Sequence, residues 1–549
     1  MTLKIYISLV VLFLVQCMEA QNLGLLTYKK DKTADGYTMI YPHNQPSVFL
    51  INNCGNIVHR WDDAPNSRAG NTAYLLPNGN LVKTKRPAAV ANDPIWAGGG
   101  GGTIEIVDWD NNVLWSYTKN DSIARLHHDI KVMPNGNILA IVWEKMSKDE
   151  AISLGRNPAL ITQDALYPDA IYEINPASSA VVWSWHVKDH LIQDFDPTKP
   201  NYGVVADHPE LVDFNYDTNN GAASWMHTNA IDYNAELDQI LISIPYFSEI
   251  WIIDHTTTTA QAASHNGGKS NRGGDLMYRI GNPAAYKNGT AADQDLFFQH
   301  NATWIQNLPF GHPDADKILV FNNRKTATAS AIEKFSTPWN MYDWDYSEVN
   351  NVFLPLSFEN TITHPGPRPF FSAGLSSAQI LPNNNILMLS GSSGYITEMT
   401  EDKEIVWEYV VPLKGGQPQE TNATLASMEN NTFRAYKYPS DYLAFMGKDL
   451  SPKGNIELNP DLTLCDRLVG SEDFTNTKTY IYPNPTSEYL WVSGGLKTIN
   501  SVLITDQNGR LVKELAKYNG LEPISISDLP AGIYYISLNN LNAEQFIKK

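Results

Sequence analysis

Three histidines stand at the same position in three consecutive copies of a sequence repeat, at the head of a short alternating strand. They are His128, His227 and His300. A single histidine of this kind ordinarily caps its strand or bonds a loop carbonyl, but three at one repeat position predict a shared site. A neutral imidazole is a competent nucleophile near neutral pH, and a covalent adduct divides one difficult group transfer into two easier steps. Three imidazoles can also ligate zinc, so a metal enzyme is an alternative.

The repeat around these histidines consists of short strands with alternating apolar residues, separated by tight polar turns such as Asn-Gly and often closed by tryptophan. This pattern is typical of β-hairpins. Regular repetition of four-strand units predicts a β-propeller, in which the first strand of each unit lines the central channel. We therefore expect an all-β chain, a six-bladed β-propeller followed by a small C-terminal β-sandwich. Five copies begin near Ala73, His128, His227, His300 and Ser377.

A sixth unit is expected to be shared by the two ends of the propeller. Val48–Trp61 has the pattern of an outer half without an inner half before it, and the missing half is expected within Ala423–Tyr436. Such sharing closes the ring without an exposed edge. Cys54 and Cys465 are the two cysteines that follow the predicted signal peptide. A disulfide between them would join both ends, and two free thiols are the alternative.

The start of the chain and its charge balance indicate export and exclude one class of partner. Residues 1–20 combine Lys4, a short apolar run and small residues, as a secretory signal does, and no stretch has the length of a transmembrane span. The 40 basic and 59 acidic residues give a net charge of −19, which argues against nucleic acid as a partner. The run Gly98–Gly102 has no helix or P-loop lysine after it and is expected to be a flexible loop.

The C-terminal residues form a separate unit by their motifs. A Tyr-Pro-Asn-Pro segment begins at Tyr482, an Asp-x-x-Gly turn at Asp506, and a Leu-Pro-Ala-Gly-Ile-Tyr-Tyr segment at Leu529. Together they resemble the C-terminal sorting domain of type IX secretion in Gram-negative bacteria. The resemblance implies that the type IX machinery is a partner, and that the protein is exported by Sec and then crosses the outer membrane to be secreted or attached to the cell surface. The expected divisions are 1–20 signal peptide, 21–466 propeller, 467–478 linker and 479–549 sorting domain.

The segments around the three histidines carry a second resemblance. His128 opens His-Asp-Ile-Lys-Val-Met-Pro-Asn-Gly-Asn, His227 lies in Trp-Met-His-Thr-Asn-Ala-Ile-Asp-Tyr-Asn, and His300 lies in Gln-His-Asn-Ala-Thr-Trp-Ile. These segments resemble the arylsulfate sulfotransferase family, a six-bladed propeller that moves a sulfuryl group from an aryl sulfate to a phenol through a sulfated histidine, without a nucleotide donor. The resemblance implies that His300 is the nucleophile, that His128 and His227 assist it, and that neither a cofactor nor a metal is needed. The implied small-molecule partners are an aryl sulfate donor and a phenolic acceptor.

One departure from the family concerns an arginine that follows the second histidine and helps to bind the sulfuryl oxygens. Pro245 or Tyr246 stands there in this chain, and loss of a forked cation removes a strong anion contact. Arg324 is a candidate replacement. Trp225 and Trp304 flank the histidines and are candidates to stack an aryl ring, with packing between blades as the alternative. If the missing arginine abolishes catalysis, a non-catalytic secreted propeller that binds a ligand or a surface partner is the alternative function.

Overall fold

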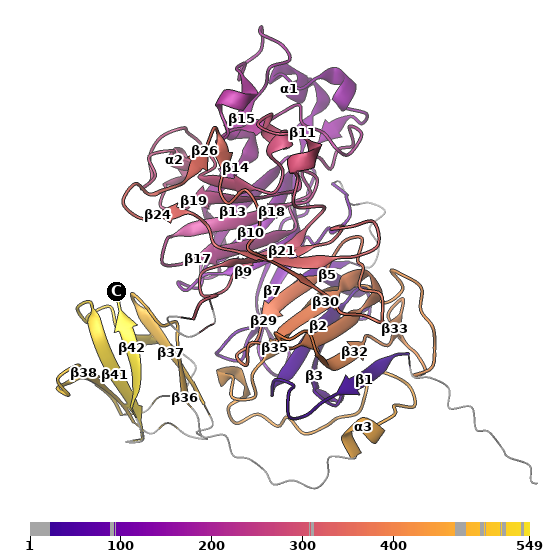
Figure 1. Ribbon diagram of the computed structural model, residues 1–549, viewed down its shortest axis with the longest axis vertical. Helices are drawn as coiled ribbons and strands as arrows, with labels where there is room; N and C mark the ends of the chain where they lie inside the picture. Colours follow the sequence, from indigo (N-terminus) through magenta and orange to yellow (C-terminus); the bar gives the residue numbers. More distant parts are fainter. Residues whose placement is uncertain are drawn as a thin grey trace, which may run out of the picture.

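The computed structural model describes residues 22–87, 93, 95–306, 308, 312–466, 479–494, 499, 501–516, 518, 523–539 and 543–549. Strands dominate this part of the chain and its helices are short (Figure 1), so the prediction of an all-β protein is confirmed. None of the described helices is long and apolar enough to cross a lipid bilayer. The predicted signal peptide, residues 1–20, and the predicted linker, residues 467–478, fall outside the described residues.

Six antiparallel sheets of four or five strands occupy the described residues between 24 and 438. From the inner strand outward, they are β35 (Thr432–Tyr438), β2 (Tyr37–Pro42), β3 (Ser47–Asn52) and β4 (Ile57–Asp62); β5 (Ser67–Leu75), β6 (Leu81–Pro87), β7 (Thr103–Val107) and β8 (Val113–Thr118); β9 (Ala124–Val132), β10 (Ile138–Glu144), β13 (Asp169–Asn175) and β14 (Ala180–His186); β17 (Ala230–Asn234), β18 (Gln239–Ile244), β19 (Glu249–Asp254) and β20 (Tyr278–Ile280); β21 (His300–Trp304), β22 (Ile318–Asn322), β23 (Ala331–Phe335) and β28 (Asn360–Thr363); and β29 (Ser377–Ile380), β30 (Ile386–Ser390), β31 (Tyr395–Met399), β32 (Ile405–Val410) and β1 (Gly24–Tyr28).

The inner strands of these sheets contact one another in turn and close a ring. The contacts run from β5 to β9, β17, β21, β29 and β35, and β35 returns to β5. The strands at which the predicted histidines lie, β9, β17 and β21, are therefore consecutive members of this ring.

Alternating side chains along each strand pack against the two neighbouring sheets. In β18, Ile240 and Ile242 belong to the apolar cluster shared with the β9 sheet, whereas Leu241 belongs to the cluster shared with the β21 sheet. Each interface between neighbouring sheets contains one such cluster. Because both faces of these sheets are buried, their strands read as nearly continuous apolar runs. This two-sided packing fixes the inner strands that carry the histidines.

The sheet that joins the two ends of the ring takes three strands from the N-terminal side and one from the C-terminal side. Strand β35 pairs with β2, with Tyr438 opposite Tyr37 and Ala435 opposite Ile40. The missing inner element was expected within Ala423–Tyr436, and the structure supplies it as the single strand β35. The closure therefore rests on main-chain pairing between segments about 400 residues apart.

Two further features secure this closure. A disulfide joins Cys54, in the turn between β3 and β4, to Cys465 in the short helix α3 (Thr463–Asp466), with the two Cα atoms 6.0 Å apart. Strand β1 adds to the outer edge of the neighbouring sheet, where Leu25 pairs with Tyr409 of β32. The repeat pattern does not predict this fifth strand.

The C-terminal residues form two antiparallel sheets around one apolar cluster. Figure 1 draws these strands in yellow. They are β36 (Thr479–Tyr482), β37 (Tyr489–Gly494) and β40 (Ile524–Ser525) in one sheet, and β39 (Leu511–Leu515), β38 (Val502–Asp506), β41 (Gly532–Leu538) and β42 (Glu544–Lys548) in the other.

The remaining described elements are short and lie in the connections between the main strands. They are strands β11 (Met146–Ser147), β12 (Ala165–Leu166), β15 (Leu191–Ile192), β16 (Val212–Asp213), β24 (Trp339–Asn340), β25 (Asp345–Tyr346), β26 (Glu348–Val349), β27 (Val352–Phe353), β33 (Leu413–Lys414) and β34 (Gln417–Pro418), helices α1 (Lys148–Ser153) and α2 (Thr259–Ala262), and 3₁₀ helices η1 (Pro158–Leu160), η2 (Val187–His190), η3 (Val205–Asp207), η4 (Pro283–Tyr286), η5 (Ala291–Asp293), η6 (Gly391–Ser393) and η7 (Leu443–Phe445).

Candidate functional site

The structure brings the three histidines of the repeat together at or just before the inner strands of three neighbouring sheets. The ring centroids of His128 and His227 are 4.5 Å apart. The ring of Phe433 in β35 neighbours both His128 and His300, with centroid distances of 6.0 Å and 6.4 Å. The side chains of His128 and His300 are buried, and that of His227 is half-buried.

The backbone at these histidines departs from regular strand. His128 and His227 have φ values of 48° and 64°, and Asn301, next to His300, has a φ of 52°. Non-glycine residues avoid this left-handed region, and the strain of order 1–3 kcal/mol persists where the surrounding structure imposes it, often at functional sites. The expectation that each histidine heads its strand holds only for His300, because His128 lies inside β9 and His227 precedes β17.

Both nitrogens of His300 have defined partners. Nδ1 lies 2.8 Å from Asn323 Oδ1 and 3.1 Å from the Phe298 carbonyl oxygen, so Nδ1 carries the ring proton. Nε2 accepts a hydrogen bond from the backbone N–H of Leu375 at 3.1 Å. Burial lowers the pKa of His300 to about 3, although the hydrogen bond to Asn323 acts to raise it. His300 is therefore neutral near pH 7, with its lone pair on Nε2.

His127, which is not among the residues predicted for the site, contacts the His128 imidazole. The Nδ1 atoms of His127 and His128 are 2.8 Å apart, and His127 Nε2 lies 3.1 Å from Asp169 Oδ1. The other carboxylate oxygen of Asp169 accepts the backbone N–H of Thr228, directly after His227. One buried carboxylate thus links the supports of two site histidines.

The imidazoles of His128 and His227 are also neutral near pH 7. Burial is the main cause that lowers the pKa of His227, to about 4, and the pKa of His128, which falls well below its ordinary value. Neighbouring histidines lower both pKa values further. His227 Nδ1 is 2.8 Å from Ser224 Oγ. The cluster can therefore supply N–H donors and lone pairs without carrying positive charge of its own.

The glycine run forms part of the wall of this site. The Gly99 carbonyl accepts the backbone N–H of His128 at 2.9 Å, and Gly99 has a φ of +83°. A Cβ on Gly99 would lie 2.0 Å from His128 Nε2, so no larger residue fits there. The run Gly98–Gly102 belongs to no helix or strand, as predicted for a loop, and it packs against an imidazole. Its flexibility stays a prediction.

A buried ion pair holds the histidine-bearing strands to the closing strand. Arg434 of β35 donates to Asp129 Oδ2 at 2.6 Å and to the Asn229 carbonyl at 3.1 Å. Asp129 also accepts from the Tyr74 hydroxyl at 2.7 Å and from the backbone N–H of Ile231 at 3.2 Å. The pair therefore connects β5, β9, β17 and β35, and it fixes residues next to His128 and His227.

An aromatic pocket of about 280 Å³ opens beside the histidines. Tyr246 lies with its ring 5.3 Å from the His227 ring, and Phe298 lies 5.9 Å from the His300 ring. Arg324 places its guanidinium 3.9 Å from the Phe298 ring centroid and donates to the Ala373 carbonyl. Pro245 also lines the pocket. Of the two residues expected to stand in place of the family arginine, Tyr246 is the one whose ring contacts a site imidazole, that of His227.

The two tryptophans predicted to stack a substrate ring do not reach the site. Trp225 is buried between Phe214 and Phe247 in the cluster between two sheets, and its indole N–H donates to the Tyr216 carbonyl. Trp304 is buried in the next cluster. Both belong to the packing between sheets, and the prediction that they bind an aryl ring is wrong.

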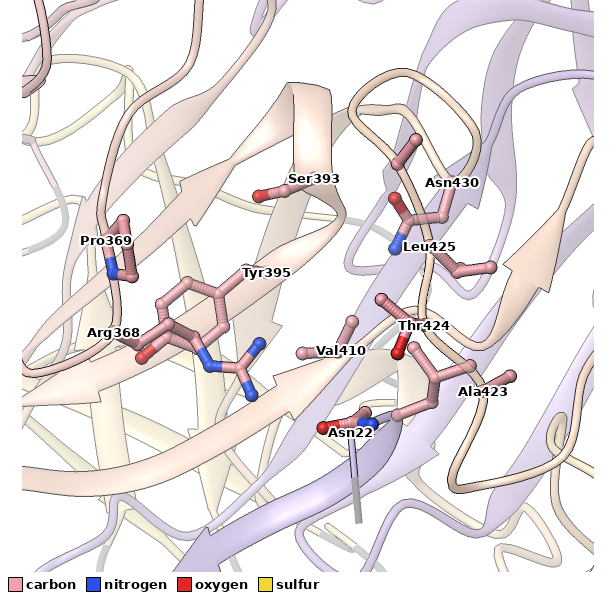
Figure 2. A pocket seen from close by; sticks show the side chains of 12 residues that line it. Asn22, Arg368, Pro369, Ser393, Tyr395, Val410, Ala423, Thr424, Leu425 and Asn430 are labelled. Carbon is pink, nitrogen blue, oxygen red and sulfur yellow. The ribbon is translucent and has the colours of Figure 1, made fainter. Parts of the chain in front are cut away.

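A second pocket, of about 240 Å³, lies away from the histidines (Figure 2). Arg368 lies beside Tyr395 on one side, and Thr424 and Asn430 line the other. None of the site histidines lines either pocket, but Tyr246 and Phe298 of the aromatic pocket lie next to His227 and His300. The aromatic pocket is therefore the one that adjoins the histidine cluster.

Comparison with protein-family models matches residues 480–549 to the secretion system C-terminal sorting domain. This domain indicates export, followed by attachment to the cell surface or secretion. No curated protein matches the chain.

Solved structures with some similarity include a protein of unknown function from Bacteroides caccae, with 9% identity, a TM-score of 0.39, and coverage of 73% of this chain and 98% of that one. Virginiamycin B lyase from Staphylococcus aureus has 12% identity, a TM-score of 0.30, and coverage of 72% and 90%. PorZ of the type IX secretion system of Porphyromonas gingivalis has 12% identity, a TM-score of 0.26, and coverage of 92% and 49%.

The three histidines, their supports and the aromatic pocket all lie within residues 26–437, which match the model of one family. The chain belongs to the arylsulfotransferase (ASST) family.

Proposed function

We propose that the protein transfers a sulfuryl group from an aryl sulfate to a phenolic acceptor, with His300 as the transient carrier and no nucleotide donor. The observation that carries this proposal is the state of His300, a buried imidazole whose ring proton is held on Nδ1 by Asn323, so that its lone pair is on Nε2. The six sheets are then the blades of a six-bladed propeller within residues 21–466, followed by a linker at 467–478 and a sandwich-like sorting domain at 479–549.

The transfer needs two displacements at sulfur. In the first, His300 Nε2 donates its lone pair to the sulfur, the S–O bond to the aryl group breaks, and the phenolate leaves with the electron pair. In the second, the acceptor oxygen attacks the sulfur, the S–N bond breaks, and its electron pair returns to Nε2. The acceptor proton ends on the released phenolate, so the two steps balance. A covalent carrier divides the reaction into two easier steps.

The protein's contribution to such a transfer is mainly positioning and electrostatic stabilisation. Asn323 holds the ring proton of His300 on Nδ1, which keeps Nε2 free to attack. The Leu375 N–H must leave Nε2 before attack, and it is then placed to donate to a sulfuryl oxygen. Because His128 and His227 are neutral, they act as hydrogen-bond donors to the sulfuryl or leaving oxygen rather than as cations.

The aromatic pocket suits the ring of the donor or the acceptor. Tyr246 and Phe298 offer ring faces or edges next to His227 and His300, and aromatic pairs prefer such offset or edge contacts. Arg324 lies at the same pocket and supplies a positive charge for an anionic substrate. This arrangement supports an aryl substrate over an alkyl one.

The decisive experiment measures phenol release from a chromogenic aryl sulfate, with and without an added phenol, for wild type and His300→Ala. We expect the phenol to accelerate release in the wild type and the substitution to abolish it. His208→Ala is the matched control, because His208 is an exposed histidine paired only with Glu210. Without acceptor, mass spectrometry should find a sulfuryl adduct on the peptide that contains His300. Full turnover in His300→Ala would refute the assignment of the nucleophile.

Inactivity toward every donor would instead favour the alternative, a propeller that binds a ligand or surface partner at the same place. A metal enzyme built on the three histidines has less support. Among the described residues, the histidine and carboxylate groups close enough to share a metal ion do not include them.

A further inference from the structure

A second cluster of histidine and carboxylate side chains lies outside the sulfotransferase site. His190 ends η2 after β14, whereas His265 and Asp275 belong to the connection between β19 and β20, which also contains α2 (Figure 1). Their donor atoms all lie within 4.8 Å of one another. Over the described part of the chain, no other group of three or more histidine, cysteine, aspartate or glutamate side chains has this spacing.

One carboxylate oxygen faces two imidazole nitrogens. Asp275 Oδ1 lies 2.7 Å from His190 Nδ1 and 2.8 Å from His265 Nδ1. On the far side of the ring, His190 Nε2 lies 2.8 Å from the Ala262 carbonyl oxygen. A carbonyl can only accept, so Nε2 carries a proton and a neutral His190 points its Nδ1 lone pair at the carboxylate. Two lone pairs at this distance repel unless a proton or a metal ion lies between them.

The surroundings hold His190 in this orientation. Trp185 stacks on the imidazole with ring centroids 5.5 Å apart, and its indole N–H donates to the Gly274 carbonyl at 2.7 Å. A Cβ on Gly274 would lie 2.6 Å from His190 Nε2, so only glycine allows this approach. A backbone carbonyl on the second ring nitrogen is a usual support of a metal-ligating histidine.

We propose that His190, His265 and Asp275 bind a divalent transition-metal ion, with zinc the best fit to two imidazoles and a carboxylate. Such ligands bind zinc at about 2.0–2.2 Å in a tetrahedron. Seating the ion requires the donor atoms to separate slightly, and the His265 side chain, 60% exposed, is free to move outward. A water molecule would complete the coordination. The ion would tie the outer edges of two neighbouring sheets, and its binding is independent of sulfuryl transfer.

The test uses the full chain, freed of metal by chelation and then dialysed against zinc chloride or cobalt chloride. We expect one ion to be retained per chain, with the cobalt form showing the visible absorption of a low-coordinate site. At a free zinc concentration about a hundredfold above Kd, Tm should rise by about 3 °C. His265→Ala should weaken binding at least about tenfold. This substitution removes an exposed side chain and should leave the unliganded protein folded.

His208→Ala is again the matched control, since this exposed histidine also pairs with a carboxylate but lacks a second imidazole. It should bind zinc as the wild type does. The proposal is overturned if the wild type retains no metal, or if wild type and His265→Ala retain it equally. Either result would assign the cluster to an ion pair in which a protonated His190 supplies the cation.

Discussion

Burial of His300, the proposed nucleophile, predicts an unusual resistance of the reaction to acid. The ordinary pKa of a histidine side chain is 6.5, whereas burial lowers the pKa of His300 to about 3. Only the neutral form has the Nε2 lone pair that attacks sulfur, and the neutral form predominates above the pKa. A lowered pKa therefore extends the active range toward acid.

The size of the effect follows from these two values. At about pH 5, an imidazole with an ordinary pKa is roughly 3% neutral, whereas one with a pKa near 3 is roughly 99% neutral. An exposed nucleophile would lose about thirtyfold in rate between pH 7.5 and 5. We expect the rate to fall almost not at all over this interval and to decline only below about pH 4, where His227 is itself about half protonated.

The assay must isolate the first half-reaction, because the acceptor phenol has an ionisation of its own. Enzyme is mixed with a chromogenic aryl sulfate in the absence of acceptor, and the single-turnover burst of phenol is read after quenching in base. The second-order rate constant of this burst, which corresponds to kcat/KM, is then plotted against pH. A decline of tenfold or more between pH 7 and 5 would refute the reasoning that His300 is neutral through burial.

The lowered pKa of His227 predicts that the free energy of unfolding decreases in acid. Proton linkage gives the direction of this change. The pKa of His227 is about 4 in the folded chain, against 6.5 ordinarily. As pH falls below 6.5, the unfolded chain takes up a proton that the folded chain does not, so stability is complete above 6.5 and declines toward pH 4. For His227 alone the loss is about 3 kcal/mol. Denaturant unfolding at several pH values should show a midpoint that falls over this range, and a flat midpoint would contradict the buried neutral state.

Three further predictions concern the framework and the anion contact. Arg434→Gln leaves the buried carboxylate of Asp129 without its cation and should cost about 3–5 kcal/mol of unfolding free energy, and Asp129→Asn in the same chain should recover much of it; additive losses in the double variant would contradict this pairing. Tyr246→Arg restores a forked cation next to the imidazoles and should raise kcat/KM for an aryl sulfate about tenfold or more, whereas a decrease would show that the aromatic ring is needed there. Cys54→Ser opens the link to Cys465 and should cost about 2–5 kcal/mol, so a reductant should lower Tm of the wild type but leave Tm of the variant unchanged.

The ring of sheets was predictable because each repeat shows the pattern of buried residues and turns within a short stretch of sequence. Residues such as Ile240, Leu241 and Ile242 alternate between two buried faces, and Asn-Gly turns mark the hairpins. A shared repeat position then placed His128, His227 and His300 on consecutive inner strands. The family assignment rested on these same segments.

The prediction that Trp225 and Trp304 stack a substrate ring was wrong because the regular alternation of side chains along a strand does not hold at the site. In a regular strand, residues two or four apart share a face, so Trp225 would join His227, and Trp304 would join His300. His227 and Asn301 have positive φ, and the pairing of β21 with β22 shifts register between His300 and Thr303. Each irregularity turns the histidine side chain away from the face of the strand on which the nearby tryptophan lies. Strand propensities of the residues do not predict such strained backbone.

The supports of the site were hidden for a different reason, which is sequence distance. Arg434 and Asp129 are 305 residues apart, and Asn323 lies 23 residues beyond His300 in a separate strand end. The closed ring brings Arg434 to Asp129, and the pairing of β21 with β22 brings Asn323 to His300. The adjacent pair His127 and His128 was the one visible signal in the sequence, since neighbouring imidazoles can hydrogen-bond to one another, as they do here.

The charge balance of the assembled site bears on the missing arginine. The imidazoles are neutral, and the cation of Arg434 is matched by Asp129 within the ring. An aryl sulfate ester carries a single negative charge, and N–H donors in a buried site can hold one such charge. In the proposed function, Tyr246 in place of an arginine would weaken binding of the sulfate without removing the N–H donors. Arg324, which lines the aromatic pocket, is a cation that can face an anionic substrate there. By the same reasoning, activity rests more on the geometry of the neutral histidines than on any fixed positive charge.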